Sequence, residues 1–423
     1  MELFLLSGWT ADGDFSKRRS TSGYCSSEQP MPLQQRVRGT PMRKKKVMSL
    51  QPKRQALMAI DIGSTSFKLC IARPQDSSLA VDRLVETLLP LNTVREGVIV
   101  DAEAVAKAMR ETLDRAGKHP KSAMLTVAGP QTLARPVRLP AMPLEVLQKS
   151  IQFEAGRYLP SATEEHYIGY EVIKQDEEHL EILLVAAPRA TIEPLVEIVE
   201  RLGIEVELVE LQPFAFWRTI QVTHAGNTPP AYAFVDIGGG HTQVSVVCGP
   251  LLALTRHIPI AGETLTAALK GYFHYCDDEA FEVKRNLNLA ELIDHTPQEN
   301  PPLRLVQPIL DELIREIRRS LNYYQSQFQS HKGREARIER LYLAGGTARM
   351  QGIAPYFEHK MGIKTEIFDP FTAETVRFDG FVPDTESAGT QWVNALGTAM
   401  VPIEQVEHDR WYSTDTVDEE VAA

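Results

Sequence analysis

Two short apolar runs in this chain each end in an aspartate, and each is followed by a glycine-containing polar turn and a second apolar run. Asp61 precedes the turn Gly63-Ser64-Thr65-Ser66, and Asp236 precedes the turn Gly238-Gly239-Gly240-His241. Either turn alone is also compatible with a simple hairpin in which glycine supplies a positive φ. A strand, a tight turn and a strand, made twice with an acidic residue at the bend, predict two similar half-domains that face one cleft.

The residue types in these turns are suited to a polyphosphate. Glycines let backbone N–H groups approach phosphate oxygens closely, and Ser and Thr hydroxyls add hydrogen bonds. An aspartate on each side supplies the carboxylates that hold the water shell of Mg²⁺. No Gly-Lys-Ser/Thr follows the glycines, so neither turn is a Walker A loop.

A third segment has a related pattern. The apolar run Arg340–Ala344 leads into Gly345-Gly346-Thr347 and then into a predicted helix. A helix N-terminus preceded by glycines suits the α-phosphate and nucleoside side of a nucleotide. The three segments together favour a nucleotide site over three unrelated turns.

Composition bounds the class of protein. A chain of 423 residues with 43% apolar content can bury a large core, and a formal net charge of −11 argues against a nucleic-acid-binding body. The four cysteines show no paired spacing, which favours a reducing compartment, and no Cys/His metal cluster is evident. No stretch approaches eighteen consecutive apolar residues, so we expect a cytoplasmic protein without a membrane span.

The two ends of the chain differ from the body. Residues 1–55 carry eleven Lys and Arg against four Asp and Glu without any periodicity, so they are expected to be disordered. The basic run 43–46 can also be interpreted as a contact with anionic lipid, and Met48 as an alternative start. The acidic tail 403–423 is also expected to be disordered.

Within the body, some elements are predicted by periodicity. Asp101 is suited to cap a helix that runs to Ala116, and the apolar stripe of residues 305–328 predicts a long amphipathic helix. Residues 287–302 and 369–390 are interpreted as loops.

In this order, the three loops resemble those of the actin/Hsp70/sugar-kinase ATPase superfamily. Residues 61–69 and 236–246 look like its two phosphate loops, 343–352 like its adenosine loop, and 394–399 like its second connecting helix. Further stretches resemble the PilM family of type IV pilus assembly proteins. These are residues 147–160, 170–173, 186–189, 262–266 and 313–324. The resemblance covers roughly residues 56–402.

This resemblance implies an α/β, actin-like ATPase fold, with two related halves around a nucleotide cleft. The first half is expected at 56–212, with a small α/β subdomain inserted at about 130–188. The second half is expected at 213–402, with a lobe at about 261–335 over the nucleotide.

The resemblance also implies roles for single residues, with ATP and Mg²⁺ as cofactors. Asp61 and Asp236 would position the magnesium-bound phosphates, and Asp236 would also be catalytic. Gly345, Gly346 and Thr347 would lie under the nucleoside. Residues of the first two loops would cradle the β- and γ-phosphates. These are Gly63, Ser64, Thr65, Ser66, Gly238, Gly239, Gly240 and Thr242.

Two positions depart from the superfamily pattern. A residue that orients the attacking water commonly precedes the first connecting helix, and here it is Gln212, a neutral amide and a poor base. Slow hydrolysis, if any, is therefore expected, and a helix-capping role for Gln212 is the alternative. In the segment that usually reads Ala-Glu-x-x-Lys, Lys284 is retained for the nucleoside, but Phe281 replaces the glutamate.

The inserted subdomain is where the resemblance implies a partner site. Phe153, Tyr158 and Leu159 would line a groove for the cytoplasmic N-terminal peptide of an inner-membrane PilN-type protein, although each can equally be a core residue. The chain would then be an ATP-binding scaffold of pilus assembly that meets other platform proteins and touches the membrane only through its partner. Whether it forms homo-oligomers is left open by the resemblance.

Two other functions remain open. An FtsA-like division protein has the same fold, but such proteins attach to membrane by a basic C-terminal amphipathic helix, and the tail here is acidic. A small-molecule kinase of the same superfamily would need a carboxylate base beside the γ-phosphate, and the sequence offers no obvious candidate.

Overall fold

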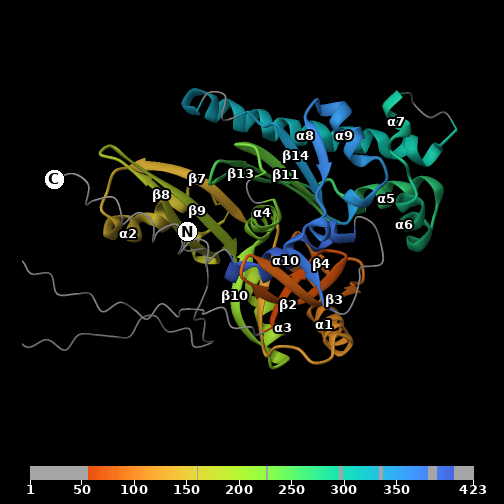
Figure 1. Ribbon diagram of the computed structural model, residues 1–423, viewed down its shortest axis with the longest axis horizontal. Helices are drawn as coiled ribbons and strands as arrows, with labels where there is room; N and C mark the ends of the chain where they lie inside the picture. Colours follow the sequence, from red (N-terminus) through yellow and green to blue (C-terminus); the bar gives the residue numbers. More distant parts are fainter. Residues whose placement is uncertain are drawn as a thin grey trace, which may run out of the picture.

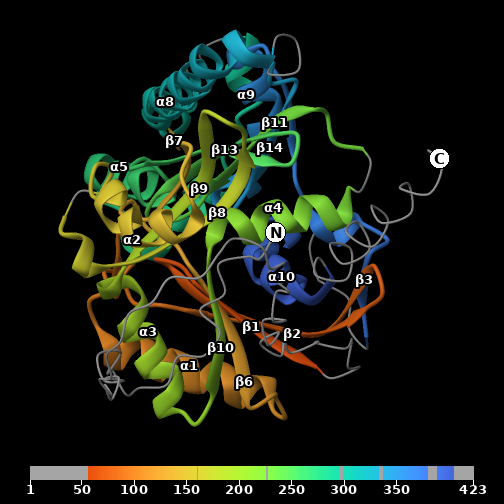
Figure 2. The same cartoon turned by 90° about the vertical axis from the view of Figure 1, so that its left-hand side faces the viewer.

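The computed structural model describes residues 56–159, 161–224, 227–294, 299–332, 337–379 and 388–403. Two β-sheets lie one above the other, with further helices on their outer faces (Figure 1). Between the sheets lie helices α4 (Gln212–Thr223) and α10 (Val393–Ala399), as the turned view also shows (Figure 2). The basic leader and residues 404–423 of the acidic tail lie outside the described residues.

The first sheet has six strands in the order β10-β6-β1-β2-β3-β16. Successive residues of β1 point to opposite faces, so Ile60 packs toward helices α1 (Ala102–Ala116) and α3 (Arg189–Arg201), while Ala59 packs toward α10. Asp101 caps α1 as predicted, since its carboxylate accepts a 2.9 Å hydrogen bond from the backbone N of Ala104. The strands are β1 (Leu57–Ile62), β2 (Ser66–Gln75), β3 (Ser78–Leu88), β6 (Ser122–Val127), β10 (Glu205–Leu211) and β16 (Val376–Phe378).

The second sheet has five strands in the order β13-β12-β11-β14-β15. Every residue of β11 and β12 is buried, because helices cover both faces of the sheet. On one face Phe234 packs on Phe216 of α4, with ring centroids 4.6 Å apart; on the other, Val235 packs in the cluster under the outer helices. The strands are β11 (Ala231–Ile237), β12 (Thr242–Cys248), β13 (Leu251–Ile258), β14 (Arg340–Ala344) and β15 (Lys364–Ile367).

The two sheets share one plan, which confirms the expected related halves. In each, an antiparallel hairpin opens the unit, and its first strand also pairs in parallel with a later strand: β1 with β6, and β11 with β14. The hairpin registers also correspond. Asp61 lies opposite Lys68 and Asp236 lies opposite Gln243, so each aspartate faces the residue seven positions further along the chain.

The outer helices of the second half form the lobe that includes the longest helix of the described chain. This helix, α8 (Pro301–Lys332), contains the predicted amphipathic stretch and buries its apolar stripe, including Leu313 and Ile317, against the second sheet. The others are α5 (Gly262–Phe273), α6 (Asp277–Arg285), α7 (Glu291–Asp294) and α9 (Ile353–Met361).

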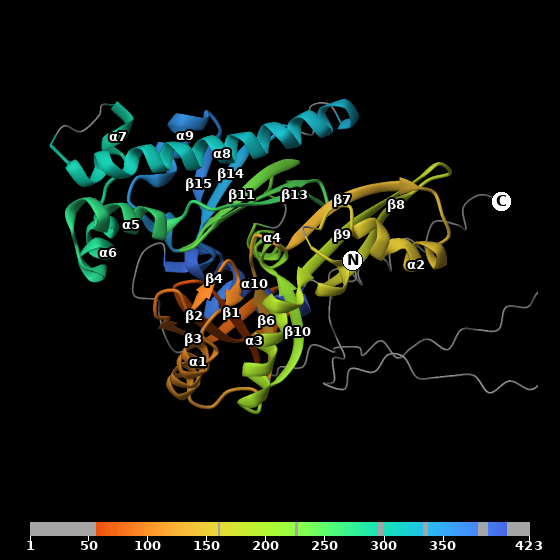
Figure 3. The same cartoon turned by 180° about the vertical axis from the view of Figure 1, so that it is seen from behind.

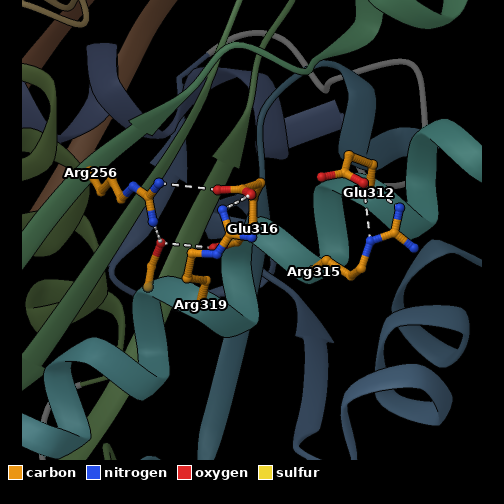
Figure 4. Close-up of polar contacts among 6 residues, drawn as sticks. Arg256, Glu312, Arg315, Glu316 and Arg319 are labelled. Atoms are coloured by element: carbon orange, nitrogen blue, oxygen red, sulfur yellow. Dashed lines mark hydrogen bonds and ion pairs between the residues drawn. The ribbon is translucent and has the colours of Figure 1, made fainter.

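A polar seam holds α8 to β13 (Figure 4). Arg256 of β13 donates to Glu316 (3.1 Å) and to the hydroxyl of Ser320 (3.2 Å), and Arg319 donates to the other carboxylate oxygen of Glu316. Arg315 pairs with Glu312 one turn away along the same helix. The seam fixes how α8 lies along the edge of the sheet.

A third, three-stranded sheet of order β7-β9-β8 projects from the first half, within the range where an inserted subdomain was expected (Figure 3). Helix α2 (Leu144–Ala155) packs on it around a small core that includes Leu147 and Ile182. β7 runs beside β13, where the hydroxyl of Thr255 donates to the carbonyl of Ala134 (2.9 Å). The strands are β7 (Leu133–Pro140), β8 (His166–Gln175) and β9 (His179–Pro188).

Two stretches predicted as loops contain regular structure. Residues 287–302 include α7 and the start of α8, and residues 369–390 include β16, which pairs in parallel with β3. Arg73 of β2 pairs with Asp82 and, at 2.6 Å, with Asp379 just beyond β16. β16 thus belongs to the first sheet, although it lies within the range 213–402 that the sequence assigned to the second half.

Candidate functional site

The two glycine turns close in the same way. The backbone N of Gly63 donates to the carbonyl of Ser66 (3.0 Å), and the backbone N of Gly238 donates to the carbonyl of His241 (3.2 Å). Each turn begins two residues after its aspartate, so the register shared by the hairpins extends into the loops. The structure therefore supports treating the two turns as equivalent parts of one site.

The second turn is oriented by the elements behind it. The carbonyl of Gly238 accepts hydrogen bonds from the backbone N of Gly262 (3.1 Å) and from the hydroxyl of Thr347 (2.8 Å), and the carbonyl of Gly239 accepts one from the backbone N of Glu263 (2.8 Å). In a planar trans peptide, the C=O and the following N–H point in opposite directions. The N–H groups of Gly239 and Gly240 therefore face away from α5, as donors to a phosphate must.

The first and second turns are in direct contact. A Cβ added at Gly239 would lie 2.6 Å from Cγ2 of Thr65 and 2.8 Å from Oγ of Ser64, and one at Gly240 would lie 3.0 Å from the same Oγ. A side chain at Gly239 or Gly240 would displace the side chains of Ser64 and Thr65. The hydroxyls of Ser64 and Thr65 and the amides of the second turn are thus brought to one place.

Asp61, near the end of β1, and Asp236, near the end of β11, are nearly buried. Burial raises the pKa of Asp61 to about 6, with Lys68 opposing the shift and the negative charge of Asp236 adding to it. Nζ of Lys68 lies 3.9 Å from the Asp61 carboxylate. Each carboxylate thus lies behind one of the two turns that meet at Gly239 and Gly240.

The carboxylate of Asp236 is held from both connecting helices. Its Oδ2 accepts hydrogen bonds from Nε2 of Gln212, at the start of α4, and from Nδ2 of Asn394 on α10 (2.9 Å). A Cβ added at Gly345 would overlap its Oδ1, so the third loop packs directly against this side chain. Gln212, Asp236 and Gly345 are thus brought together.

Asn394 is the site residue that sequence reasoning missed, because it was noted only as part of the second connecting helix. Asn394 and Thr398 are the only polar side chains in the run 393–399, and the amide of Asn394 was the available signal.

The predicted nucleoside side is assembled around Gly262. A Cβ there would overlap the hydroxyl of Thr347 and lie 3.3 Å from Nζ of Lys284. Lys284 donates to the carbonyl of Gly262 (3.2 Å) and to the hydroxyl of Thr266 (2.9 Å), and burial lowers its pKa to about 8. Phe281 is half exposed, with its ring 5.1 Å from the same ammonium. Gly346 follows Gly345 and precedes the short helix that starts at Thr347.

Two predicted phosphate ligands are less available than expected. Thr242 is fully buried at the start of β12, and its hydroxyl donates to the carbonyl of Ile260 (2.7 Å). Ser66 is also buried, and its carbonyl closes the first turn. Both side chains lie at the base of their turns, so their predicted contact with phosphate stays a prediction.

The donor set suits a hydrated magnesium ion. Besides the two carboxylates, Oε1 of Gln212 and Oδ1 of Asn394 are buried and have no hydrogen-bond partner among the described residues. No cluster of three or more His, Cys, Asp or Glu able to hold a metal occurs in the part of the chain that the structure describes. Oxygen donors with few protein ligands are the arrangement in which Mg²⁺ keeps waters and binds phosphates.

The residues predicted to bind a partner do not share one environment. Phe153 on α2 is 77% exposed, whereas Tyr158 and Leu159 are partly buried against the core of the inserted sheet. The guanidinium of Arg135 lies 4.4 Å from the centre of the Tyr158 ring. Phe153 is therefore exposed for a partner, while the other two also support the subdomain itself.

Comparisons with known proteins agree with this architecture. A family model described as type IV pilus assembly protein PilM matches residues 59–402. Among solved structures, the chain is similar to one titled PilM-PilN type IV pilus biogenesis complex, with a TM-score of 0.71, 22% identity, and coverage of 83% of this chain and 99% of that one.

More distant similarities extend to other proteins of the same fold. MreB 5 of Spiroplasma citri bound to AMPPNP aligns with a TM-score of 0.50 and 12% identity, over 86% of this chain and 100% of that one. The cell division protein FtsA of Bacillus subtilis is 24% identical over 55% of this chain, and the match spans 58% of FtsA. The solved structures, at these identities, establish the actin-like ATPase fold.

Proposed function

The chain belongs to the family of the type IV pilus assembly protein PilM, and we propose that it is an ATP-binding, actin-like scaffold of pilus assembly that captures a peptide of an inner-membrane PilN-type protein. The observation that carries the nucleotide part is the contact between two equivalent turns with an aspartate behind each. The partner part rests on the family and on the exposed face of the inserted sheet.

Each group in the cleft would have a separate task. The amides of Gly239 and Gly240 and the hydroxyls of Ser64 and Thr65 would bind the phosphates, while Thr347 and Lys284 would lie toward the nucleoside. Asp61 and Asp236 would hold the waters of Mg²⁺, which when bound neutralises phosphate charge. MreB 5, which shares the fold, was solved with an ATP analogue.

Gln212 would orient the attacking water. Its Nε2 is anchored on Asp236, so its Oε1 is left to accept a hydrogen bond from a water molecule. Because an amide cannot take up the proton of that water, turnover should be slow. ATP would then act mainly as a clamp between the two halves.

The inserted sheet offers an edge for peptide capture. Among the described strands, β8 pairs with β9 alone, so its outer edge carries main-chain groups that an extended peptide can bind. Val172 and Ile173 of β8 are each 37% exposed, and Phe153 is exposed on the neighbouring helix α2. A peptide with alternating apolar side chains fits such an edge.

A peptide titration tests the partner role. A synthetic PilN-type cytoplasmic N-terminal peptide should bind the wild-type chain in calorimetry, and Phe153→Ser should weaken binding severalfold. Tyr272→Ser is the matched control, since Tyr272 is an exposed aromatic residue (67%) on the lobe of the second half. Absence of peptide binding with and without Mg-ATP would refute the partner role and leave the nucleotide role standing.

An FtsA-like role is the second candidate, favoured by the match to Bacillus subtilis FtsA. It predicts direct attachment to anionic vesicles, whereas the scaffold role predicts a cytoplasmic protein that reaches the membrane through its partner. No helix of the described residues is long and apolar enough to cross a membrane. Sedimentation with anionic vesicles, with and without the peptide partner anchored in them, separates the two roles.

A further inference from the structure

Asn394 makes a contact that the packing of its helix does not require. It lies on α10, is only 4% exposed, and donates from Nδ2 to Oδ2 of Asp236 at 2.9 Å. Gln212 of α4 donates to the same oxygen. One carboxylate oxygen is therefore held by both helices that connect the halves.

The crossing of α4 and α10 is fixed by other residues. A Cβ at Gly397 would overlap the carbonyl of Ala215, and the hydroxyl of Thr219 donates to the carbonyl of Val393 (2.7 Å). Thr398 of α10 is hydrogen-bonded to Thr126 of β6 at 2.5 Å. Since these contacts define the helix positions, a polar residue at 394 is not needed for the crossing itself.

The chemistry of the amide fixes its orientation. If the amide of Asn394 were turned over, its oxygen would face the oxygen of a carboxylate, and the hydrogen bond would become a repulsion. The NH₂ group must therefore face Asp236. The amide oxygen is then left buried without a partner among the described residues, which is unfavourable unless a further group satisfies it.

We propose that Asn394 is a positioning residue for the metal-binding carboxylate of Asp236, and that it fixes this carboxylate in the orientation in which Mg²⁺ bound to ATP is recognised. This inference rests on the proposed nucleotide site. Because the amide donates to a charged group, its hydrogen bond is among the stronger ones in a protein. The amide acts through Asp236 and is given no role in the chemical step.

The test measures how much Mg²⁺ improves ATP binding. The dissociation constant of ATP is determined by calorimetry in excess Mg²⁺ and again in EDTA. The value in EDTA divided by the value in Mg²⁺ is the magnesium gain. Asn394→Ala should reduce this gain by roughly tenfold, the effect of losing one hydrogen bond to a charged group. Affinity in EDTA should change little, because Asn394 makes no contact with the phosphate turns.

Thr398→Val is the matched control. It removes a buried hydrogen bond from the same helix, one turn further on and away from Asp236, so it should leave the magnesium gain unchanged. Asn394→Leu, which keeps the branched shape of the side chain but has no donor, serves as the second variant if the alanine variant does not fold. It should lose the gain as the alanine variant does.

The outcomes separate this inference from the proposed function. A wild-type chain that binds ATP equally with and without Mg²⁺ overturns this inference and the proposed magnesium site, and leaves ATP binding standing. A wild-type chain that binds no ATP in either condition overturns the proposed nucleotide role as well. A wild-type chain with a clear magnesium gain, retained by both Asn394 variants, overturns the role of Asn394 alone. Equal losses of affinity in Mg²⁺ and in EDTA would show that Asn394 serves packing instead, and would also overturn it.

Discussion

Arg218 of α4 and Glu210 of β10 form an ion pair with a 3.0 Å contact in which each side chain is only 1% exposed. Arg218 also donates to the carbonyl of Gly397 on α10 (2.8 Å). The pair therefore joins β10, an edge strand of the first sheet, to both connecting helices. Such a pair is stable only while both charges are present, because a lone charge in this position has lost its water.

Removing one partner of this pair should therefore be costly. Arg218→Met is expected to lower the free energy of unfolding by about 3–5 kcal/mol, measured by urea denaturation. The double variant Arg218→Met with Glu210→Leu should recover much of that loss, since no uncompensated charge remains. A single variant as stable as the wild type would contradict this account of the buried ion pair.

Gly239→Ala should impair nucleotide binding. The added methyl group would overlap the side chains of Thr65 and Ser64, so these side chains must rotate away or the two turns must separate. Either change moves the hydroxyls that are proposed to bind phosphate. We expect at least a tenfold weaker affinity for Mg-ATP in calorimetry, a loss of about 1.4 kcal/mol. Gly271→Ala is the control, because a Cβ at this helical glycine meets nothing within 4 Å and should leave binding unchanged.

Asp61→Asn should stabilise the nucleotide-free protein near neutral pH. The pKa of Asp61 is raised to about 6, so the folded chain binds more protons than the unfolded chain between the ordinary value of 3.8 and about 6, and stability falls as pH rises through that window. The variant avoids this penalty, and we expect a gain of about 3 kcal/mol at pH 7.

The gain should vanish below about pH 4, where the carboxyl is protonated in both states. Denaturation curves across this range provide the measurement. The same substitution should remove most of the magnesium gain in ATP binding, so improved stability accompanied by intact Mg²⁺ dependence would argue against a metal role for Asp61.

Lys284 should make nucleotide affinity depend on pH. Its pKa is lowered to about 8 by burial, so its positive charge is progressively lost as pH rises past that value, and attraction to an anionic ligand is lost with it. ATP affinity should fall between pH 7 and pH 9, and Lys284→Met should flatten the profile. Lys270→Met, at a lysine paired with Asp277 on the same lobe, should retain the wild-type profile.

The parts of the fold that local pattern determines could be predicted from the sequence. Both acidic hairpins, the cap of α1 at Asp101 and the apolar stripe of α8 follow from residues that are neighbours along the chain. The contact between the two turns likewise follows from the repetition of one pattern rather than from either turn alone.

What could not be predicted depends on contacts between distant segments. β16 has three residues, too few to show an alternating pattern, and it is a strand because β3 offers it an edge. Asn394 acquires its contact with Asp236 only when α10 crosses α4. Likewise, aromatic side chains at 153 and 158 look alike in sequence, but Phe153 is exposed while Tyr158 packs beside Arg135.

Neighbouring residues of β13 face different elements. Thr255 is bonded to the inserted sheet, which the chain enters and leaves from the first half, while Arg256 is bonded to α8 of the second half. The inserted sheet is thus covalently part of one half and docked on the other. If the inserted sheet captures a peptide as proposed, a ligand that alters the relative positions of the halves should also alter the affinity for the peptide. Thermodynamic reciprocity would then make the peptide alter the affinity for that ligand by the same factor.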